Sequence, residues 1–451
     1  MNSMTPQSIW MRHLIIALCV AMPWLNPFAS SPSTAVIPLL VSWMLAACAL
    51  LAVVELPLVK TRWSKYEIAG GMALFVWLLT SLVWVPEVID RALTVGLVAS
   101  LMCIWLMAGV GRRAAVNERM LRWCVAALFS AALISAVLGV LQYVGWAHVL
   151  SPWVNQPIKG DAFANLRQRN QFASLTSLGL VALMGWIAVQ TNARNMSRLG
   201  WVLACVLINI LSAGVASSVS RTGAMQWFVI SMLMTAWAWH RSKYTEMSKG
   251  LVWFALAVPV WMIVWSVLLP WIALQTTGEW GASLILRVTG QAQDYAACGG
   301  RRVLWANALT LIGQHPWLGW GWGETDYAHF MTHYNGVRFC DMLDNAHDLP
   351  LHLALEFGVP LAIVVMALVF VWGLRRAPWR ESHAWRLMAW CMLLVLGLHS
   401  LMEYPLWYGP FQMTLGFAIG LLWADPNIRP NEERQEGPVL IAAIVFIGCL
   451  Y

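Results

Sequence analysis

The sequence has few charged residues. Only 11% of its 451 residues are Asp, Glu, Lys or Arg, whereas a soluble domain carries about 25%. Apolar runs of about 20 residues, the length that crosses a bilayer as a helix, recur along a chain that is 60% hydrophobic. We therefore expect an all-α polytopic membrane protein. We attribute its net charge of +7 to orientation in the membrane, with no nucleic acid as partner.

Signatures of metal and nucleotide sites are also missing. The sequence has no His-Glu-x-x-His, no closely spaced pair of cysteines, no Asp-rich loop and no Gly-x-x-x-x-Gly-Lys. These absences argue against zinc, divalent-cation and phosphate-loop sites, so we expect metal-independent chemistry without a cofactor. Of nine cysteines, only Cys298 and Cys340 lie in a long loop. An oxidising compartment would allow them to form a disulfide, and the sequence leaves this open because it does not supply the geometry.

The apolar runs predict about twelve transmembrane helices. The first run continues through Pro23 and Pro27 into the second, so we expect no cleavable signal peptide. The last residues, 437–451, are too few to cross unaided, which predicts a partial thirteenth span or a chain that is cut short. The predicted spans are 12–29, 33–56, 67–85, 91–110, 121–146, 171–190, 199–217, 222–240, 251–275, 349–374, 386–401 and 408–424.

Basic residues indicate the orientation of these spans. Nineteen of the 28 Lys and Arg residues lie in the N-terminus and in the breaks after even-numbered spans, leaving nine for the opposite side. Short basic loops stay in the cytoplasm, so we expect a cytoplasmic N-terminus in a bacterial inner membrane. The opposite, periplasmic side then carries one large loop. The predicted parts are N-terminal helices (1–146), middle helices with a periplasmic "NLRQRN" loop (147–275), the large periplasmic loop (276–348) and C-terminal helices (349–451).

Arginines on the periplasmic side depart from the orientation bias. Arg221 lies between two apolar runs with almost no loop around it, and an arginine near the end of a span usually faces a cavity. Several guanidinium groups facing one compartment suit a pyrophosphate or another polyanionic ligand. The alternative is that each one extends to phospholipid headgroups. The residues concerned are Arg167, Arg169, Arg221, Arg287, Arg301, Arg302 and Arg338.

Histidines and acids gather where the span at 349 begins. His347 lies between Asp344 and Asp348, and a neutral imidazole held by a carboxylate can act as the general base for a hydroxyl. The alternative is a structural cluster in which Asp344 caps the helix and the histidines only pack. Two pairs spaced by four residues, and therefore on one helix face, favour a function on this side of the membrane: His352 with Glu356, and His399 with Glu403.

The segment "HPWLGWGWGE" (315–324) alternates Trp with Gly. Tryptophan prefers the headgroup level of a bilayer, so we interpret this segment as a flexible re-entrant stretch at the membrane surface. A sugar-stacking role is the weaker alternative.

Together, these motifs resemble the O-antigen ligase and polymerase superfamily of bacterial inner-membrane glycosyltransferases. The resemblance is carried by "SVSRTG", by "GRRVLWANALTLIGQHPWLGWGWGE" and by "DNAHDLPLHLALEFGVP", in that order over about 200–375. "FANLRQRNQFASL" and "HSLMEYPLWYGPF" are similar to the branch of protein O-oligosaccharyltransferases.

The resemblance implies a donor, an oligosaccharide on undecaprenyl pyrophosphate, and transfer to an acceptor hydroxyl in the periplasm. It implies that Arg221 and Arg301 engage the pyrophosphate and that His347 is the essential histidine. Two departures stand out. His347-Asp348 replaces the usual His-Asn, where a carboxylate could alter the basicity or orientation of the histidine. We also expect no counterpart here of the periplasmic domain that normally follows in the protein-modifying branch.

The resulting prediction is a single inverting displacement onto Ser or Thr of an exported protein. His347, Arg221 and Arg301 would be catalytic, and no metal would take part. Alternatives are an O-antigen ligase that transfers glycan to lipid A-core, a polymerase, or a non-enzymatic transporter of lipid-linked glycan. In each case membrane lipids are expected partners. The candidates for binding donor or acceptor are Arg167, Arg169, Arg302, Asp344, Asp348, His399 and Glu403.

Overall fold

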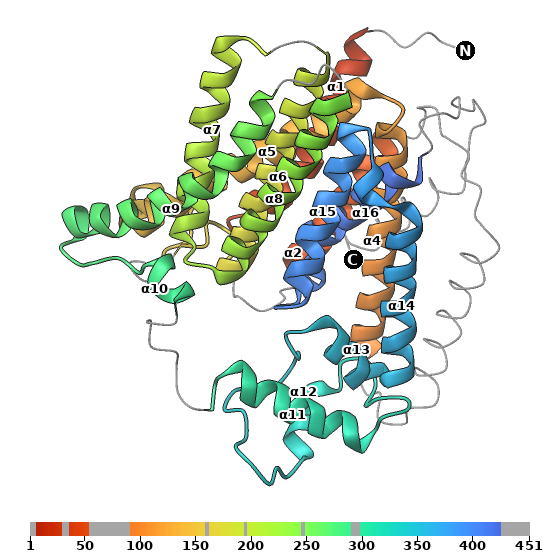
Figure 1. Cartoon of the computed structure of the whole chain (residues 1–451). Coiled ribbons are helices and arrows are strands. Elements are labelled where there is room, and N and C mark those ends of the chain that lie inside the picture. The colour runs from red at the N-terminus through yellow and green to blue at the C-terminus, as the bar shows by residue number, and fades with distance from the viewer. Residues whose placement is uncertain are drawn as a thin grey trace.

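The computed structural model describes residues 6–28, 36–53, 91–157, 162–193, 196–244, 249–289 and 298–424. Within these ranges all regular structure is helical, as predicted. Figure 1 shows two parts, a bundle of long helices and a smaller group of helices below it. The smaller group, here called the loop subdomain, contains α11 (Arg301–Gln314), α12 (Thr325–Met331) and α13 (Leu349–Phe357), and α14 (Val359–Arg376) leads from it along the bundle.

Helices occupy every predicted span that falls within the described residues. The predicted spans 67–85 and 437–451 lie outside those residues. Seven helices are long and apolar enough to cross a membrane by length and composition, so the protein is a membrane protein, although this number does not establish the twelve spans expected. The bundle comprises α1 (Pro6–Leu25), α2 (Val36–Val53), α4 (Arg91–Ala114), α5 (Glu118–Tyr143), α6 (Arg169–Ala193), α7 (Arg198–Ser217), α8 (Arg221–Tyr244), α9 (Gly250–Thr277), α15 (Ala384–Ser400) and α16 (Gly409–Trp423).

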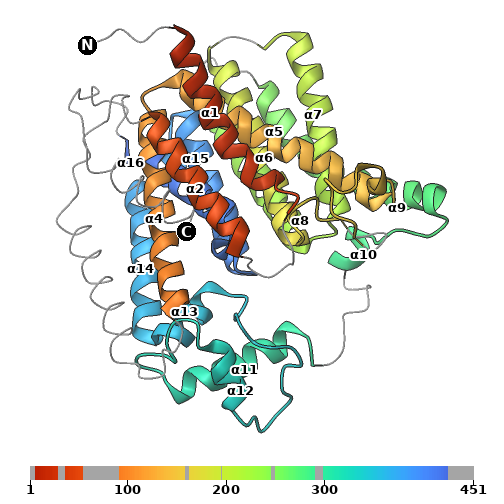
Figure 2. The same ribbon diagram turned by 180° about the vertical axis from the view of Figure 1, so that it is seen from behind.

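Small residues and a central helix hold the bundle together. Helix α6 contacts α5, α7, α8 and α15, and 89% of its apolar stretch is buried. Helices α4 and α16 pack so closely that a Cβ on Gly416 or Gly420 would overlap the carbonyl oxygen of Ile104 or Ala108. Such close approach through glycine is the usual way helices associate where no water drives them together. Seen from behind, α1 and α2 lie side by side on the outer face of the bundle (Figure 2).

The predicted span 349–374 is not one helix. It is divided at Gly358, whose φ of +87° is readily adopted only by glycine. Before the break, α13 packs against α11 within the loop subdomain. After it, α14 provides the apolar stretch suited to a membrane. The sequence pattern concealed this break because both halves are apolar, and α13 is buried against protein.

The Trp-Gly segment 315–324 docks onto this break. The amides of Trp320 and Gly321 donate to the carbonyls of Leu355 and Glu356, and the amide of Val359 donates to the carbonyl of Pro316, each at 2.9 Å. Gly319 lies against the backbone of Glu356 with no room for a Cβ. The glycines of this segment therefore allow close backbone contact, which is a structural use that the sequence interpretation had not included.

The short connections complete the fold. Helix η1 (Ala147–Leu150) follows α5, and α10 (Leu284–Val288) lies in the first part of the segment 276–348. That segment was predicted as a large loop, and its described residues contain three helices, α10, α11 and α12. Helices η2 (Pro378–Arg380) and η3 (Pro405–Trp407) form the turns on either side of α15.

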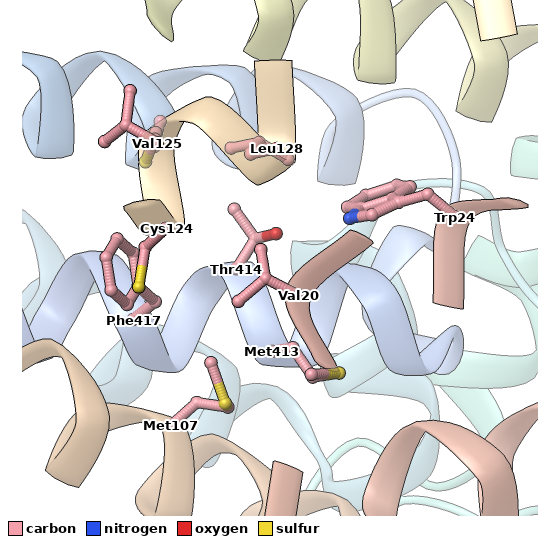
Figure 3. A pocket seen from close by; sticks show the side chains of 10 residues that line it. Val20, Trp24, Met107, Cys124, Val125, Leu128, Met413, Thr414 and Phe417 are labelled. Atoms are coloured by element: carbon pink, nitrogen blue, oxygen red, sulfur yellow. The ribbon is translucent and has the colours of Figure 1, made fainter. Parts of the chain in front are cut away.

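A small pocket lies inside the bundle, where α1, α4, α5 and α16 meet (Figure 3). Trp24, Met107, Leu128 and Phe417 are among the side chains around it, and its lining includes no carboxylate, imidazole or basic group. This pocket offers packing space and no acid–base chemistry. The polar residues that the sequence singled out gather elsewhere, where the loop subdomain meets the bundle.

Candidate active site

His347 lies in the turn that precedes α13. Its φ of +51° places it in the left-handed region, where a non-glycine residue is uncommon and costs about 1–3 kcal/mol. The Asn345 side chain accepts the His347 amide at 2.7 Å and so supports this turn. The ring of Tyr404 packs edge-on against the imidazole, with centroids 4.9 Å apart. The backbone thus presents this one side chain in a fixed direction.

Glu403 is the partner of His347. It lies in the turn between α15 and η3, and its Oε2 is 2.6 Å from His347 Nδ1. Its Oε1 accepts a hydrogen bond from Arg301 Nη2 at 3.0 Å, and the same nitrogen donates to the carbonyl of Met402 at 2.8 Å. His347 and Arg301 belong to the loop subdomain, whereas Glu403 belongs to the bundle. One carboxylate therefore joins the two parts of the fold.

The charge of this carboxylate is maintained by its neighbours. Burial would raise the pKa of Glu403, but the hydrogen bond from His347 and the charge of Arg301 lower that pKa below its ordinary value. Burial raises the pKa of Tyr404 to about 12, so its hydroxyl stays protonated. Glu403 is therefore an anion at neutral pH and can accept a hydrogen bond from the protonated Nδ1 of His347. His347 is then left with the lone pair of Nε2 for a base.

The sequence had paired Glu403 with His399, four residues earlier. In the structure His399 is fully buried, and its Nδ1 lies 2.9 Å from Ser174 Oγ. The two residues still line one small polar pocket with Gln168, Gln171, Tyr404, Pro405 and Tyr408. The helical pairing was wrong, because α15 ends at Ser400 and Glu403 lies in the turn beyond it, where its side chain contacts His347.

His352 and Glu356 form a second, separate pair. They are buried, with Nε2 and Oε2 3.4 Å apart. Glu356 Oε1 accepts from the amide of Gly323 at 3.0 Å and from the hydroxyl of Thr325 at 3.2 Å. Burial raises the pKa of Glu356 to about 8. This pair anchors the Trp-Gly segment within the loop subdomain.

Three other candidate residues lie outside this contact. Asp348 caps α13 by accepting from the amide of Leu351 at 3.0 Å, so the carboxylate that contacts the His347 ring is that of Glu403. Asp344 is exposed. Arg167, with a φ of +57°, donates to Asn155 Oδ1 at 2.6 Å.

Four of the other candidate arginines lie in the first turn of a helix. Arg221 is the first residue of α8 and is exposed, and Arg169 is the first residue of α6 and half-buried. Arg301 and Arg302 begin α11, where Arg301 contacts Glu403 and Arg302 is exposed. The sequence had predicted a catalytic role for Arg301 and a binding role for Arg302, and in the structure it is Arg301 that contacts Glu403.

Asn170 is the main site residue that the sequence interpretation missed. Its Nδ2 donates to Glu403 Oε1 at 2.8 Å. It stood in view within the quoted "NLRQRNQF" motif, where the arginines had drawn attention because of their charge. A neutral amide gives no such signal, and only the fold brings it to a residue 233 positions away.

Metal ligands do not gather among the described residues, where no group of three or more His, Cys, Asp and Glu side chains could hold an ion. Cys298 and Cys340 are free thiols, and the neighbouring Cys298 raises the pKa of the Cys340 thiol. The site therefore consists of a histidine, a carboxylate, an arginine and an amide. Its groups can move a proton and hold an anion.

Comparison with known proteins matches three segments of this chain. Residues 206–366 match the O-antigen ligase family, residues 162–186 match a protein glycosylation ligase family, and residues 387–451 match the C-terminal region of virulence factor membrane-bound polymerases. His347, Arg221 and Arg301 fall in the first segment, Asn170 in the second and Glu403 in the third. These matches identify the chain as a glycosyltransferase that is similar to the O-antigen ligase and protein glycosylation ligase families. The resemblance noted in the sequence is thereby confirmed.

Two relatives point to the same branch. A general O-oligosaccharyltransferase of Acinetobacter baylyi is 24% identical over 97% of this chain and 74% of its own length. A ComP-specific O-oligosaccharyltransferase of the same organism is 22% identical over 65% of this chain and 49% of its own length. The chain thus spans about three quarters of one relative and about half of the other. Both relatives are named O-oligosaccharyltransferases, which agrees with the match of residues 162–186 to a protein glycosylation ligase family.

Proposed function

We propose that this glycosyltransferase moves an oligosaccharide from undecaprenyl pyrophosphate to a Ser or Thr hydroxyl of an exported protein. The single observation that carries the proposal is the His347–Glu403–Arg301 group at the junction of bundle and loop subdomain. It supplies a base and a cation at one place. The matches to protein glycosylation ligases and to O-oligosaccharyltransferases support a protein acceptor.

The reaction is a single displacement. The acceptor oxygen forms a bond to the anomeric carbon while the bond from that carbon to the phosphate oxygen breaks. His347 Nε2 takes the proton of the hydroxyl, and undecaprenyl pyrophosphate leaves as an anion. The cations Arg301 and Arg221 stabilise the charge that develops on the leaving phosphate. Attack opposite the leaving group inverts the anomeric configuration.

The lipid carrier determines where this chemistry takes place. Its tail lies in the bilayer and its pyrophosphate at the surface, so the reacting groups belong at one membrane interface. The basic connections between spans favour a cytoplasmic N-terminus in an inner membrane, and we infer from this orientation that the loop subdomain is periplasmic. The base, the arginines and the loop subdomain then face the compartment in which exported proteins are found.

A second candidate is transfer to another glycan. The segment 387–451, which contains Glu403, matches a polymerase region, and residues 206–366 match O-antigen ligases. The same base and cations would serve a sugar hydroxyl of lipid A-core or of a repeat unit. The two functions differ in the acceptor and share the mechanism.

The test is transfer by the purified full chain in lipid nanodiscs, with undecaprenyl-pyrophosphate oligosaccharide as donor. A pilin-type protein, lipid A-core and donor alone are offered in parallel. We expect glycan on the protein with inverted configuration, and a loss of about 100-fold or more in His347→Ala. His333→Ala is the matched control, because His333 is an exposed histidine of the same subdomain.

Glycan on lipid A-core alone would replace the protein acceptor by a ligase function. Retention of configuration would exclude a single displacement. Equal transfer by His347→Ala and wild type would remove His347 from the chemistry.

A further inference from the structure

The side-chain amide of Asn170 donates one hydrogen bond through its nitrogen and accepts another through its oxygen. Because a carboxylate only accepts hydrogen bonds, the Asn170 atom that faces Glu403 Oε1 at 2.8 Å must be the NH₂ group. Its Oδ1 then faces the hydroxyl of Ser220, which donates to it at 2.6 Å. The amide orientation follows from the partners on both sides, because a reversed amide would set its oxygen against the Glu403 carboxylate.

Ser220 completes the chain at the start of α8. Its Oγ accepts from the amide of Gly223 at 3.1 Å, which is the hydrogen bond of a helix N-cap. Since that hydroxyl oxygen accepts from the helix, its proton is available for Asn170. All donors then point one way, from the α8 N-terminus through Ser220 and Asn170 to Glu403, and hydrogen bonds in such a chain strengthen one another.

The chain joins the two chemical functions of the site. At one end it holds the carboxylate whose other oxygen binds His347 Nδ1. At the other end it fixes the turn before Arg221, where Val219 has a φ of +51°. A β-branched residue rarely adopts that conformation, so the turn needs support. Ser220 is buried, and its bond to Asn170 provides that support.

We propose that Asn170 is a positioning residue that sets the Glu403 carboxylate against His347 and, through Ser220, the turn that presents Arg221. It acts on the reaction through Glu403. The proposal rests on the proposed function, because positioning has meaning only if His347 and Arg221 act on a substrate. It identifies why an uncharged amide belongs at this place.

Asn170→Asp is the sharpest variant because it keeps the shape and removes the donor. When ionised, the introduced side chain would place a second carboxylate against Glu403 Oε1. Two carboxylates in one site share a proton, which raises the pKa of one of them. While protonated, the introduced carboxyl can donate to Glu403 and accept from Ser220 as the asparagine does. The charged or titratable groups that also face Glu403 are His347, Arg301, His399, Tyr404 and Tyr408.

The pH dependence therefore has a defined sign. The ratio of Asn170→Asp activity to wild-type activity should be highest at low pH and fall as pH rises through the raised carboxyl pKa. Asn170→Ala cannot regain the donor, so its ratio should be low at every pH. We expect kcat to fall about 10- to 100-fold in Asn170→Ala, with a smaller change in KM for the donor.

The experiment measures kcat and KM for glycan transfer by the full chain between pH 5 and 9. Asn117→Asp is the matched control for the added charge, because Asn117 caps α5 outside the site and aspartate also caps. Ser220→Ala and Ser220→Thr test the other end, and only threonine keeps a hydroxyl that can both cap and donate. Thermal unfolding of each variant shows whether it is folded.

The outcomes separate the two proposals. A falling activity ratio in Asn170→Asp, with Ser220→Thr more active than Ser220→Ala, supports positioning. Folded Asn170→Ala with wild-type kcat would overturn the role of Asn170 while leaving the proposed function intact. A uniform loss in Asn170→Asp, the same at every pH, would also overturn it. A wild-type chain that transfers no glycan to any acceptor would overturn the proposed function, and the positioning role with it.

Discussion

Replacing Glu403 by Gln should stop His347 from acting as the base without changing the shape of the site. Oε1 of Glu403 receives donors from Arg301 and Asn170. In the variant, these two donors will keep the oxygen of the introduced amide on their side. The amide NH₂ must then face His347 Nδ1, which has to accept from it. The imidazole proton moves to Nε2, the nitrogen that would otherwise take the proton of the acceptor hydroxyl.

The magnitude follows from the geometry. A hydrogen bond to a charged group contributes about 1.5–3 kcal/mol, and the His347–Glu403 bond of 2.6 Å is at the short end of such bonds. At about 1.4 kcal/mol per factor of ten, losing this bond alone would lower kcat about 10- to 100-fold. Loss of the base adds to this, because positioned general bases contribute about 100- to 10,000-fold. We therefore expect kcat to fall by at least about 100-fold, with KM for the donor less affected.

The assay is single-turnover transfer from lipid-linked oligosaccharide by the full chain, measured across pH. The matched control is Glu381→Gln. Glu381 is a carboxylate of similar exposure, 12% against 11% for Glu403, and it is paired with Arg386 rather than with a histidine. We expect Glu381→Gln to retain wild-type kcat. Because the tautomer is wrong, higher pH should not restore Glu403→Gln. Activity within about threefold of wild type would refute the assignment of Glu403 as the partner that orients His347.

Three further predictions concern the loop subdomain. The pKa of Glu356 is raised by burial to about 8 against about 4.3 when unfolded, so the folded state holds a proton that the unfolded state releases. The free energy of unfolding should decline as pH rises between these values, and Glu356→Gln should remove that decline in thermal unfolding from pH 5 to 8. Gly319→Ala should lower the free energy of unfolding by more than about 1 kcal/mol, because φ is +73° and a Cβ would overlap the Glu356 backbone. Gly313→Ala is the control, because a Cβ there meets open space and should not destabilise the fold. Equal Tm values for the two variants would contradict this prediction. Arg301→Lys should lower kcat/KM at least about tenfold, because an ammonium cannot reproduce the planar fork of donors, while Arg122→Lys on an exposed pair should have no effect in the same transfer assay.

The helical class and most spans could be predicted because a helix that faces lipid requires about 20 consecutive apolar residues, which are visible in the sequence. Every described predicted span contains helix, and the boundary errors are small except at Gly358. That break could not be found from hydropathy, because α13 is apolar for a different reason. Its buried face packs on α11 and on the Trp-Gly segment, and burial in protein and burial in lipid select the same residues.

The charged residues of the candidate site could be predicted from the sequence, but the contacts between them could not. His347, Arg301 and Glu403 were singled out because ionisable groups at the ends of membrane spans are costly to bury and usually have a function. Their mutual contacts span 56 and 102 positions and depend on where the loop subdomain rests on the bundle. Spacing rules such as four residues on one helix face reach only local neighbours. They therefore paired Glu403 with His399, four residues earlier, rather than with His347.

The way the site is divided between the two parts of the fold bears on its stability. The bundle provides the Glu403 carboxylate and the Asn170 amide, while the loop subdomain provides His347 and Arg301. A carboxylate that is 11% exposed is costly to bury without donors, and two of the three side chains that bond to it come from the subdomain. The subdomain therefore cannot leave this position without exposing or protonating Glu403. The contact that orients the base is thus also one that holds the subdomain on the bundle, so activity and docking should be lost together when this side chain is removed, as in Glu403→Ala, whereas Glu403→Gln should lose activity alone.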